Sequence, residues 1–488
     1  MRITKLTKRH QILLMFIAAV VAILWVSNAP TNTVELPIAD EPLYNLPLVN
    51  GTIGQEVTLR GQLGVVSSDA LDFESSETYA FLVEDDGDII ELQLPDNLLY
   101  SVHTSYEVSV SGTLIDADPT RSNDAPILDV SRLNVLSGDD IQNSVTGNER
   151  WVNVACRFSD IDATPRDRDY FEQIMENNTP GMDDYWRQTS SDLVNIEGSA
   201  AYGWYNLPQT KDYYLRSASV NVGMALQLLM RDCVEQARQN DNVDFKQFAG
   251  INIMLNDTFG CCAWGGSMAL NIDGENIRFR TTWLPPWAYN SLHVIAHEMG
   301  HGWGLPHSGG SRNHARYPYD SAWDIMSGGT WMVEECKVIH SVFDCIQVAT
   351  IGFHLEMLGW IPQERIVTVE QGESATITLD SLTTVREGNN DLMVKVPIGN
   401  SGRFYTVEAR SFVGYDQNLP EETVILHTVQ PGRSEPAQVV DDDNNDNVND
   451  EGAMWMPGET YEDSRNNIRI EVLSRDGTTF TVRVTNGG

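Results

Sequence analysis

Basic residues are scarce in this chain. Its 488 residues include 32 lysines and arginines against 69 aspartates and glutamates, and the formal net charge is −37. A protein that binds nucleic-acid phosphates needs clustered lysine and arginine, so this balance argues against a nucleic-acid partner. A strongly acidic surface keeps an exported protein soluble by self-repulsion, although it selects no particular substrate. The hydrophobic fraction of 41% is ample for packed globular domains.

Cysteine is scarce as well. The six cysteines all lie between residues 150 and 350, at Cys156, Cys233, Cys261, Cys262, Cys336 and Cys345. No pair has the Cys-x-x-Cys spacing of a zinc site, which disfavours a cysteine-based metal centre. An even number in an exported chain predicts disulfides instead, although the sequence leaves most of the connectivity open. We expect Cys336 to pair with Cys345 across a short loop. The adjacent Cys261 and Cys262 are expected to bond elsewhere, because sequence neighbours rarely bond to each other.

The N-terminus combines a basic flank with an apolar run. Four basic residues (Arg2, Lys5, Lys8 and Arg9) precede an unbroken apolar stretch over residues 12–26, which is typical of an export signal. Residues 1–29 are therefore either a cleaved signal peptide or an uncleaved anchor that attaches the chain to a membrane through residues 12–29. In both cases the positive flank stays in the cytoplasm and the rest is exported. We expect an extracellular, periplasmic or membrane-anchored protein that faces outward.

Changes in the hydrophobic pattern divide the exported part into three domains after a linker over residues 30–50. Residues 51–140 contain five short alternating segments separated by turns, which predicts a small β-barrel similar to oligonucleotide/oligosaccharide-binding (OB) barrels. We interpret this part as an accessory domain or pro-domain. Residues 147–362 mix helices and strands, which predicts an α+β catalytic domain. Residues 363–488 return to strands and predict a β-sandwich.

An acidic run from Asp441 to Asp446 lies in the last domain. Its oxygen atoms are suitable ligands for Ca²⁺, but the run lacks the glycine and the spaced glutamate of a helix–loop–helix calcium loop. The pattern is typical either of a calcium site or of a solvated acidic loop, and the sequence leaves both open.

One segment has the spacing of a catalytic metal site. It reads His297-Glu298-Met299-Gly300-His301-Gly302-Trp303-Gly304-Leu305-Pro306-His307. On a helix, residues four apart share a face, so His297 and His301 present their imidazoles together. Gly304 can take a positive φ that ends the helix, which lets His307 return as a third ligand. Three protein ligands plus water is a catalytic zinc coordination, and Glu298 can act as the general base on that water.

Chance does not account for this spacing. In a chain with ten histidines among 488 residues, a random His-Glu-x-x-His occurs about one time in a hundred, and the added Gly304 and His307 lower this to roughly a few in 100,000. The stretch also predicts a helix with one buried side, because Leu292, Ile295 and Met299 are apolar. Three further histidines are expected to be surface or core residues and not ligands: His314, His340 and His354.

The motif resembles the signature of the metzincin zinc endopeptidases, HExxHxxGxxH followed by a Met-turn. Met326, nineteen residues beyond His307, is the candidate Met-turn methionine, which packs beneath the ligands and is not itself a ligand. Residues 319–327 and 352–361 are similar to the gametolysin-like branch. Residues 405–410, 414–416 and 457–460 are similar to the β-domain of that branch and of immune-inhibitor-A-like peptidases. The histidine at 307 favours the gametolysin side, because the second group usually has aspartate there.

The resemblance covers roughly residues 150–488 and implies a zinc-dependent endopeptidase that acts on extracellular proteins. It also implies a twisted mixed sheet with an active-site helix. Zinc would polarise the scissile carbonyl, while Glu298 takes a proton from the water and delivers it to the leaving amine. Metzincins usually bind an extended substrate against a strand above the cleft, and Ser267–Ile272 is the candidate strand by family order.

Three departures from the family pattern affect these expectations. Gly328 stands where some metzincins have an additional tyrosine ligand, so no such ligand is expected there. Ser308 stands where several branches have aspartate, which leaves the surroundings of His307 open. No cysteine precedes Cys156, which argues against latency through a pro-domain cysteine bound to zinc.

Two other functions stay open from the sequence. A zinc-binding pseudoenzyme or adhesive surface protein would use the two β-domains, but it would have no need of Glu298. A hydrolase of cell-wall-linked peptides would use the same motif as an ordinary protease. The substrate and the oligomeric state are not indicated.

Overall fold

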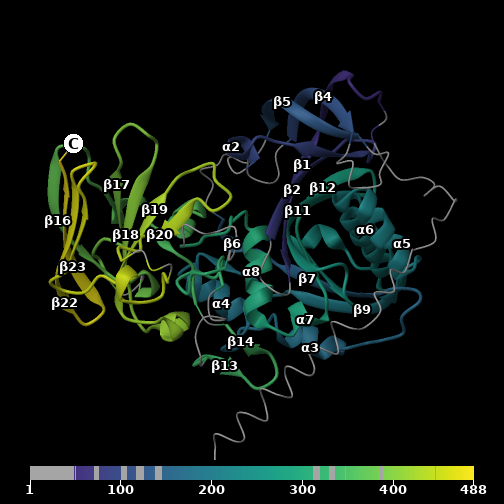
Figure 1. Ribbon diagram of the computed structural model, residues 1–488. Coiled ribbons are helices and arrows are strands. Elements are labelled where there is room, and N and C mark those ends of the chain that lie inside the picture. Colours follow the sequence, from purple (N-terminus) through teal and green to yellow (C-terminus); the bar gives the residue numbers. More distant parts are fainter. Residues whose placement is uncertain are drawn as a thin grey trace, which may run out of the picture. The chain divides into compact units, whose positions relative to one another are not determined.

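The computed structural model describes residues 49, 51–70, 76–99, 107–116, 126–137, 145–310, 319–328, 336–346, 348–384, 388–443, 445 and 447–487. The protein is multidomain, with several sheets and few helices, as the sequence predicts (Figure 1). The signal-or-anchor segment 1–29 lies outside the described residues, as does the linker 30–50 apart from Val49. The domain boundaries inferred from the sequence stay predictions.

The N-terminal strands alternate between two hydrophobic clusters. The elements are β1 (Glu56–Ala70), β2 (Ser76–Val83), β3 (Ile89–Gln93), α2 (Asp96–Leu99), β4 (Glu107–Asp116) and β5 (Pro126–Ser137). Strand β1 pairs with β2 and β4, and β3 pairs with β2 and β5, while β4 pairs with β5. On β2, Ala80 and Leu82 face the small cluster of these strands, whereas Phe81 and Val83 join the cluster of the next domain. This period of two follows from the strand geometry. The alternating pattern predicts the first of these strands over Val57–Leu63, and in the structure β1 continues seven residues further, to Ala70.

The central sheet is mixed. Its strands are β7 (Trp151–Arg157), β9 (Ala200–Asn206), β10 (Gly250–Leu255), β11 (Cys262–Ile272) and β12 (Glu275–Leu284), in the order β11-β12-β10-β7-β9. Strand β10 is parallel to β7 and β12, whereas β11 is antiparallel to β12. The outer side of β11 pairs with β1, so the N-terminal strands continue this sheet. Two short strands, β6 (Gly147–Asn148) and β8 (Val194–Asn195), pair with each other beside it.

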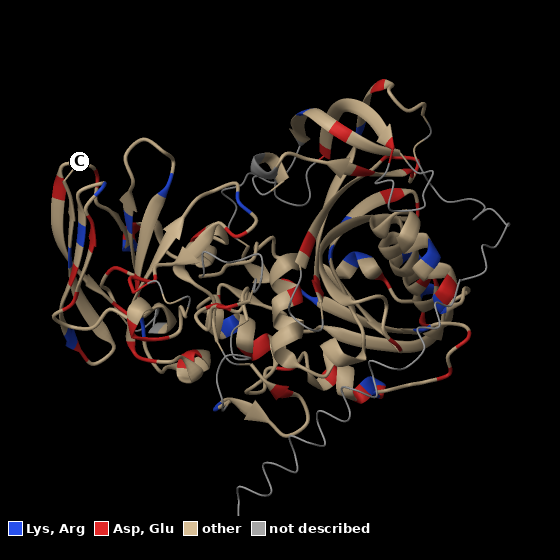
Figure 2. Cartoon of the chain, viewed as in Figure 1, with Lys and Arg blue, Asp and Glu red and all other residues tan. Residues whose placement is uncertain are grey.

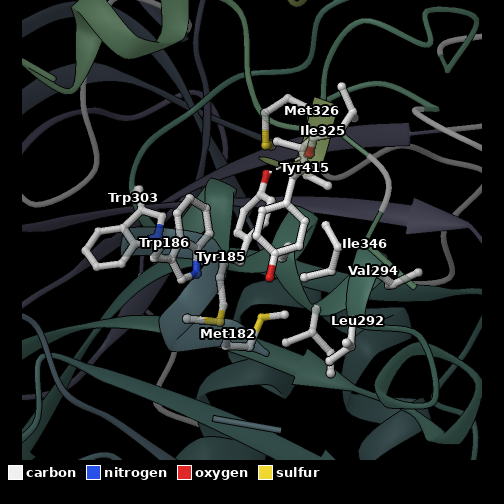
Figure 3. Close-up of a cluster of buried hydrophobic side chains, with 14 of the residues drawn as sticks. Met182, Tyr185, Trp186, Leu292, Val294, Trp303, Ile325, Met326, Ile346 and Tyr415 are labelled. Atoms are coloured by element: carbon white, nitrogen blue, oxygen red, sulfur yellow. Dashed lines mark hydrogen bonds between the residues drawn. The ribbon is translucent and has the colours of Figure 1, made fainter. Parts of the chain in front are cut away.

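Helices cover both faces of the central sheet, each over its own hydrophobic cluster (Figure 1). Helices α5 (Lys211–Val220) and α6 (Val222–Asp241) cover one face. The other cluster holds residues of α3 (Arg168–Gln173), α4 (Met182–Thr189), α7 (Pro286–Tyr289), α8 (Leu292–Gly302) and α9 (Gly352–Met357). Aromatic side chains fill this second cluster, and Figure 3 shows Trp186 beside Trp303, with Tyr185 and Tyr415 facing each other. Apolar residues at helical spacing predict a helix over Val220–Arg238, and α6 confirms it from Val222 onward.

The C-terminal strands form two antiparallel-rich sheets with one shared core. The first contains β15 (Ile366–Thr368), β17 (Met393–Pro397), β18 (Phe404–Arg410), β19 (Thr423–Val429) and β20 (Ala437–Val439). The second contains β16 (Glu373–Leu379), β21 (Thr460–Asp463), β22 (Ile468–Asp476) and β23 (Thr479–Asn486). Apolar residues of both sheets, among them Val407 and Val482, lie in the same cluster.

The cysteines lie in three pairs at disulfide distance. Cys336 pairs with Cys345, as predicted, beside the hairpin of β13 (Ile339–His340) and β14 (Asp344–Cys345). Cys156 on β7 pairs with Cys233 on α6 and ties the helix to the sheet. The expectation that Cys261 and Cys262 bond elsewhere is wrong, because they pair with each other at the start of β11. The other four cysteines are used among themselves, which leaves these two only one another.

Acidic positions outnumber basic ones along the described elements, and the two signs are interspersed (Figure 2). Arg187, for example, contacts both Asp183 and Glu197. The absence of a nucleic-acid partner stays a prediction. Within the described ranges, no helix is long and apolar enough to cross a membrane. The disulfide-distance cysteines fit an extracellular protein, while export itself stays a prediction.

The two longer-range cysteine pairs should differ in what they contribute to stability. Loop-closure entropy rises with the length of the loop: it gives about 4–5 kcal/mol for the separation of 77 residues between Cys156 and Cys233, against about 2.5–3 kcal/mol for the separation of 9 between Cys336 and Cys345. We expect the Cys156→Ser/Cys233→Ser variant to lose more unfolding free energy than Cys336→Ser/Cys345→Ser in urea denaturation. Equal losses would contradict the pairing across β7 and α6.

Candidate metal centre

Helix α8 carries the first two predicted ligands in a fully buried setting. All of its residues from Leu292 to Gly302 are buried, with Ile295 and Met299 in the hydrophobic cluster. Strand β11 lies directly against it: a Cβ on Gly265 would be 2.3 Å from the carbonyl oxygen of Glu298. A glycine is therefore required where strand and helix touch. This contact fixes the height of the helix against the sheet.

The three predicted histidines converge on one point. The Nε2 atom of His307 lies 3.2 Å from Nε2 of His297 and 3.0 Å from Nε2 of His301. The other ring nitrogens of the two helical histidines face backbone carbonyls. Nδ1 of His297 donates to the oxygen of Ile325 at 2.7 Å, and Nδ1 of His301 donates to that of Leu305 at 2.8 Å. The predicted ligand set is therefore brought together.

The carbonyl partners decide which nitrogen carries the proton. A carbonyl oxygen only accepts, so Nδ1 of His297 and of His301 must be the protonated atom in the neutral ring. The Nε2 lone pairs of both rings then point at the shared space. Burial, with a contribution from His307, lowers the pKa of His301 to about 4, which keeps this ring neutral at physiological pH. Neutral imidazole is the form that binds metal.

Gly304 turns the chain as the sequence predicts. Its φ is +93°, a left-handed conformation that favours glycine. The helix ends at Gly302, and the amide of Leu305 donates back to the carbonyl of Gly300 at 3.0 Å. This tight return places His307 beside the two helical ligands. The predicted role of Gly304 is confirmed.

Met326 packs beneath the helix. It is fully buried, and a Cβ on Gly300 would lie 2.3 Å from its sulfur atom, so the Met-turn and α8 touch where the helix has no side chain. Backbone atoms on either side of Met326 support the ligands. Ile325 supplies the carbonyl for His297, and the carbonyl of Met326 accepts from the amide of Ser308 at 3.1 Å. The predicted packing position of Met326 is confirmed.

A buried aspartate organises the surroundings of the third ligand. Asp324 accepts from the hydroxyl of Ser308 at 2.6 Å and from that of Thr350 at 2.7 Å, and it lies 2.9 Å from Nδ1 of His354. Burial opposes its ionisation, but His354 and these hydroxyls hold the pKa of Asp324 below its usual range. Ser308, left open by the sequence, therefore connects His307 to the Met-turn through Asp324. His354 is a buried core residue, as predicted.

The C-terminal strands reach this same turn. Arg410 on β18 is fully buried and donates to the carbonyl of Trp323 at 2.8 Å, immediately before Asp324. Its guanidinium also makes two hydrogen bonds to Asp416, at 2.8 and 2.9 Å. Glu408 accepts from the amide of Gly352 at 2.8 Å. Glu408, Arg410 and Asp416, which the sequence connected with the site only through a family resemblance, thus support the segments that pack beneath the histidines.

Glu298 carries a buried carboxyl group next to the three histidines. It is fully buried, and no cation or backbone donor in the described part of the chain pairs with either of its carboxylate oxygens. Burial, followed by the negative charge of Asp69 and a hydrogen bond with that side chain, raises the pKa of Glu298 well above its usual range. A buried carboxyl group without a counter-charge costs folding free energy, and such groups mark sites where a ligand or a reaction is accommodated.

Asp69 is a member of the group that the sequence did not predict. Its side chain comes from β1, is 3% exposed and points at the histidines. Oδ1 lies 2.9 Å from Nε2 of His307, and Oδ2 lies 3.4 Å from Nε2 of His301 and 3.6 Å from Nε2 of His297. Burial favours the neutral acid, but His307 and the other two rings hold the pKa of Asp69 well below its usual range. No spacing rule links residue 69 to residues 297–307, so the sequence held no signal for it.

Tyr319 is the second unpredicted neighbour. Its hydroxyl donates to Asp69, and its ring centroid lies 5.4 Å from that of His307 and 6.0 Å from that of His297. Burial and Asp69 raise the pKa of this phenol well above its usual range, so it stays a donor. The absence of a tyrosine at 328 has a steric reason, because a Cβ on Gly328 would lie 1.9 Å from the carbonyl oxygen of Tyr319.

The strand above the site differs from the expectation in two ways. The part of β11 near Glu298 is residues 262–267, whereas the predicted strand was Ser267–Ile272. This part is also not an edge, because β1 pairs with it in antiparallel fashion from Val65 opposite Ser267 to Ala70 opposite Cys262. Of the candidate strand Ser267–Ile272, only Ser267 pairs with β1, so its role as the substrate strand stays a prediction. The segment of β11 nearest Glu298 is instead the one that the N-terminal domain covers by a long-range pairing.

The donor set fits a zinc ion. Two nitrogens that are each about 2.0–2.1 Å from a tetrahedral zinc lie about 3.4 Å apart, close to the 3.0 and 3.2 Å between the Nε2 atoms. The four potential ligand atoms of Asp69, His297, His301 and His307 all lie within 4.8 Å of one another. Three nitrogens and one oxygen around a buried point suit zinc among the common metals.

Among the described residues, the other predicted metal and histidine positions are not part of this group. The acidic run is described only in part, and there Asp443 accepts from the amide of Asn445 at 2.9 Å. The Ca²⁺ site stays a prediction. His340 stacks on Phe343, away from the ligands, and His314 lies outside the described residues.

Comparison with known proteins adds no family. No protein-family model matches the chain, and no curated protein matches its sequence. The chemistry of the site therefore has to be argued from its own geometry.

The contact between Gly300 and Met326 predicts a sensitive position for metal binding. An alanine at Gly300 would place its methyl group 2.3 Å from the Met326 sulfur, so the turn that holds His297 must shift. We expect Gly300→Ala to weaken zinc binding about 10- to 100-fold, measured by competition with a chelating dye. The double variant Gly300→Ala/Met326→Ala removes the clash and should recover most of the affinity, with Met326→Ala alone as the control. An unchanged affinity in Gly300→Ala would contradict this packing.

Proposed function

We propose that this chain is a zinc-dependent endopeptidase that hydrolyses peptide bonds of extracellular proteins. The observation that carries the proposal is the convergence of three imidazole nitrogens, with Nε2 of His307 at 3.0 and 3.2 Å from the other two, beside the buried carboxyl group of Glu298. A protein that only stores or carries zinc needs the imidazoles and has no use for a base next to them.

The arrangement of the elements supports a metzincin-like assignment on the gametolysin side. Within the mixed central sheet, the antiparallel strand β11 packs on the helix that carries the ligands. The turn at Met326 lies under that helix. The pairing order of β1 to β5 supports an OB-like barrel in the N-terminal domain, and the shared core of the two C-terminal sheets supports a β-sandwich.

Each residue has a distinct role in the proposed reaction. His297, His301 and His307 would hold the ion, which when bound polarises the scissile carbonyl and acidifies its water. Glu298 takes one proton from the attacking water as the C–O bond forms, and it then passes this proton to the amine that leaves as the C–N bond breaks. Its raised pKa is suited to an acid that must hold that proton between the two steps. Tyr319 can donate to the oxygen of the carbonyl under attack.

One observation favours a second candidate, a zinc-binding protein without catalysis. Four protein ligands are typical of structural zinc sites, whereas catalytic sites keep a position for water. Asp69 completes such a four-ligand group. The two candidates differ in what happens when Asp69 is removed: a catalytic site gains an open position, and a structural site loses affinity and gains nothing.

Removal of the base tests the proposal. We expect about one zinc per chain in the parent and in Glu298→Gln, because the glutamate is not a ligand. Hydrolysis of fluorescein-labelled denatured casein should fall by about 10²- to 10⁴-fold in the variant. The pair is compared in the parent chain and in the Asp69→Ala chain, so that occupancy by Asp69 does not hide activity. Zinc-loaded protein that hydrolyses nothing in either background would rule out the peptidase and favour the non-catalytic candidate.

Tyr319 provides a test of the local chemistry. In the Asp69→Ala background, Tyr319→Phe removes one donor near the carbonyl oxygen and should lower kcat about 10²-fold. KM and zinc content should change little, since neither the ligands nor the peptide-binding strand is altered. A drop in zinc content instead of in kcat would show that the phenol only positions the ligands. An unchanged kcat would show that it has no part in the reaction.

A further inference from the structure

Strand β1 occupies the position on β11 that an extended peptide would take. From Val65 to Ala70 it is antiparallel to residues 262–267, the part of β11 that packs on the ligand-bearing helix. An extended peptide binds such a strand by the same main-chain hydrogen bonds that hold two strands of a sheet. While β1 is in place, those donors and acceptors of β11 are used.

The side chains of β1 also fill the space around the metal centre. Val65 and Ser67 line a small cavity together with His301, Leu305 and His307, and the cavity has a volume of about 60 Å³. With β1 in place, the space beside His301 and His307 is too small for an extended peptide.

Asp69 brings the charge that the group of histidines lacks. Its carboxylate faces the three Nε2 atoms at 2.9, 3.4 and 3.6 Å. Oδ2 is buried and faces the rings of His297 and His301. Together the three imidazole nitrogens and the carboxylate oxygen make the three-nitrogen, one-oxygen set of a four-coordinate zinc.

The rest of the N-terminal domain holds β1 in this position from a distance. Phe81 on β2 points away from the domain's own core and packs against α6, where a Cβ on Gly223 would lie 2.3 Å from the Phe81 ring. Val66, Ala70 and Val83 bury in the same cluster. These contacts lie on the face of the sheet opposite α8, so they act on β1 without touching the ligands.

From these contacts we propose that the N-terminal β-domain is a built-in inhibitor of the metal centre, with Asp69 as the fourth zinc ligand in the place of water and β1 in the place of substrate on β11. The proposal rests on the proposed peptidase function and adds its regulation. The chain as it stands is a latent form, and it becomes active when β1 leaves β11. The absence of a cysteine in this domain is then no obstacle to latency, because the ligand is a carboxylate.

Two variants test the proposal by independent routes. Asp69→Ala removes the ligand itself, and Asp69→Asn keeps its size without its charge. Phe81→Ala weakens the hold on α6 and leaves both the ligands and the small domain's own core intact. Asp129→Ala, at an exposed position on β5, removes one carboxylate from the same domain and is the matched control for Asp69→Ala.

Access to the metal is measured without reference to catalysis. Acetohydroxamate is a small metal chelator that needs an open coordination position, and its affinity for the zinc-loaded chains is read by calorimetry. A closed state that predominates lowers the apparent affinity by the fraction of open chains. We expect acetohydroxamate to bind at least about tenfold more tightly to Asp69→Ala and to Phe81→Ala than to the parent and to Asp129→Ala. The absorption of the cobalt(II)-substituted protein should change between the parent and Asp69→Ala and stay the same in Asp129→Ala, because only the former loses a ligand.

The outcomes separate this proposal from the peptidase assignment. Equal acetohydroxamate affinity and an identical cobalt spectrum in the parent and Asp69→Ala would overturn the role of Asp69, even if all chains hydrolyse casein. A rise in affinity accompanied by Glu298-dependent hydrolysis at least about tenfold above the parent supports both proposals. Normal zinc content and improved chelator binding without hydrolysis would keep Asp69 as the fourth ligand and overturn the peptidase. Phe81→Ala that binds acetohydroxamate no better than the parent would overturn the part of the proposal that assigns the holding role to the domain.

Discussion

Three imidazole rings converge through their Nε2 atoms, and a metal ion binds such rings only when their Nε2 lone pairs are free and correctly oriented. The protein meets this requirement by fixing the rings from behind. The carbonyls of Ile325 and Leu305 hold the protonated nitrogens of His297 and His301, so the orientation of each ring is set by backbone that is itself packed. Two close contacts hold the helix that carries these histidines. Gly265 of β11 packs on the backbone of Glu298, and Met326 packs on Gly300 of the helix.

The turn beneath the histidines, around Asp324, depends on the C-terminal strands, which are far away in sequence. Asp324 and Arg410 are buried charges, and a buried charge is tolerated only when its hydrogen bonds are complete. Asp324 is satisfied by two hydroxyls and a histidine, and Arg410 by Asp416 together with the carbonyl of Trp323. Loss of one partner would leave the others uncompensated, so the hydrogen bond by which Arg410 joins the C-terminal strands to the turn at Met326 depends on Asp416 as well.

The N-terminal strands answer a different physical problem. An unpaired strand beside a metal centre is a surface that accepts any extended chain, and proteins normally cover such edges. Here the cover is β1, which presents Asp69 to the histidines while it satisfies the main chain of β11. A substrate would need two features: an unpaired strand and an open coordination position at the metal. The N-terminal domain occupies both. Strand β1 and a substrate peptide would therefore compete for the same position on β11. Contacts such as that of Phe81 with α6 favour β1.

The sequence by itself determined what depends on local spacing. The period of the helix placed His297 and His301 on one face, and the conformational freedom of Gly304 allowed His307 to lie beside them. Alternating residues predicted most strands, although the predicted β1 ended seven residues before the observed strand. The short spacing between Cys336 and Cys345 likewise predicted that these two cysteines pair. Asp69, Tyr319, the partners of Asp324 and the pairing of Cys261 with Cys262 were decided only by the tertiary structure. Each depends on the register between segments far apart in the chain, and above all on β1 against β11, where a shift of one residue would turn Asp69 away from the histidines. No local pattern encodes that register, because it follows from the packing of two domains on each other.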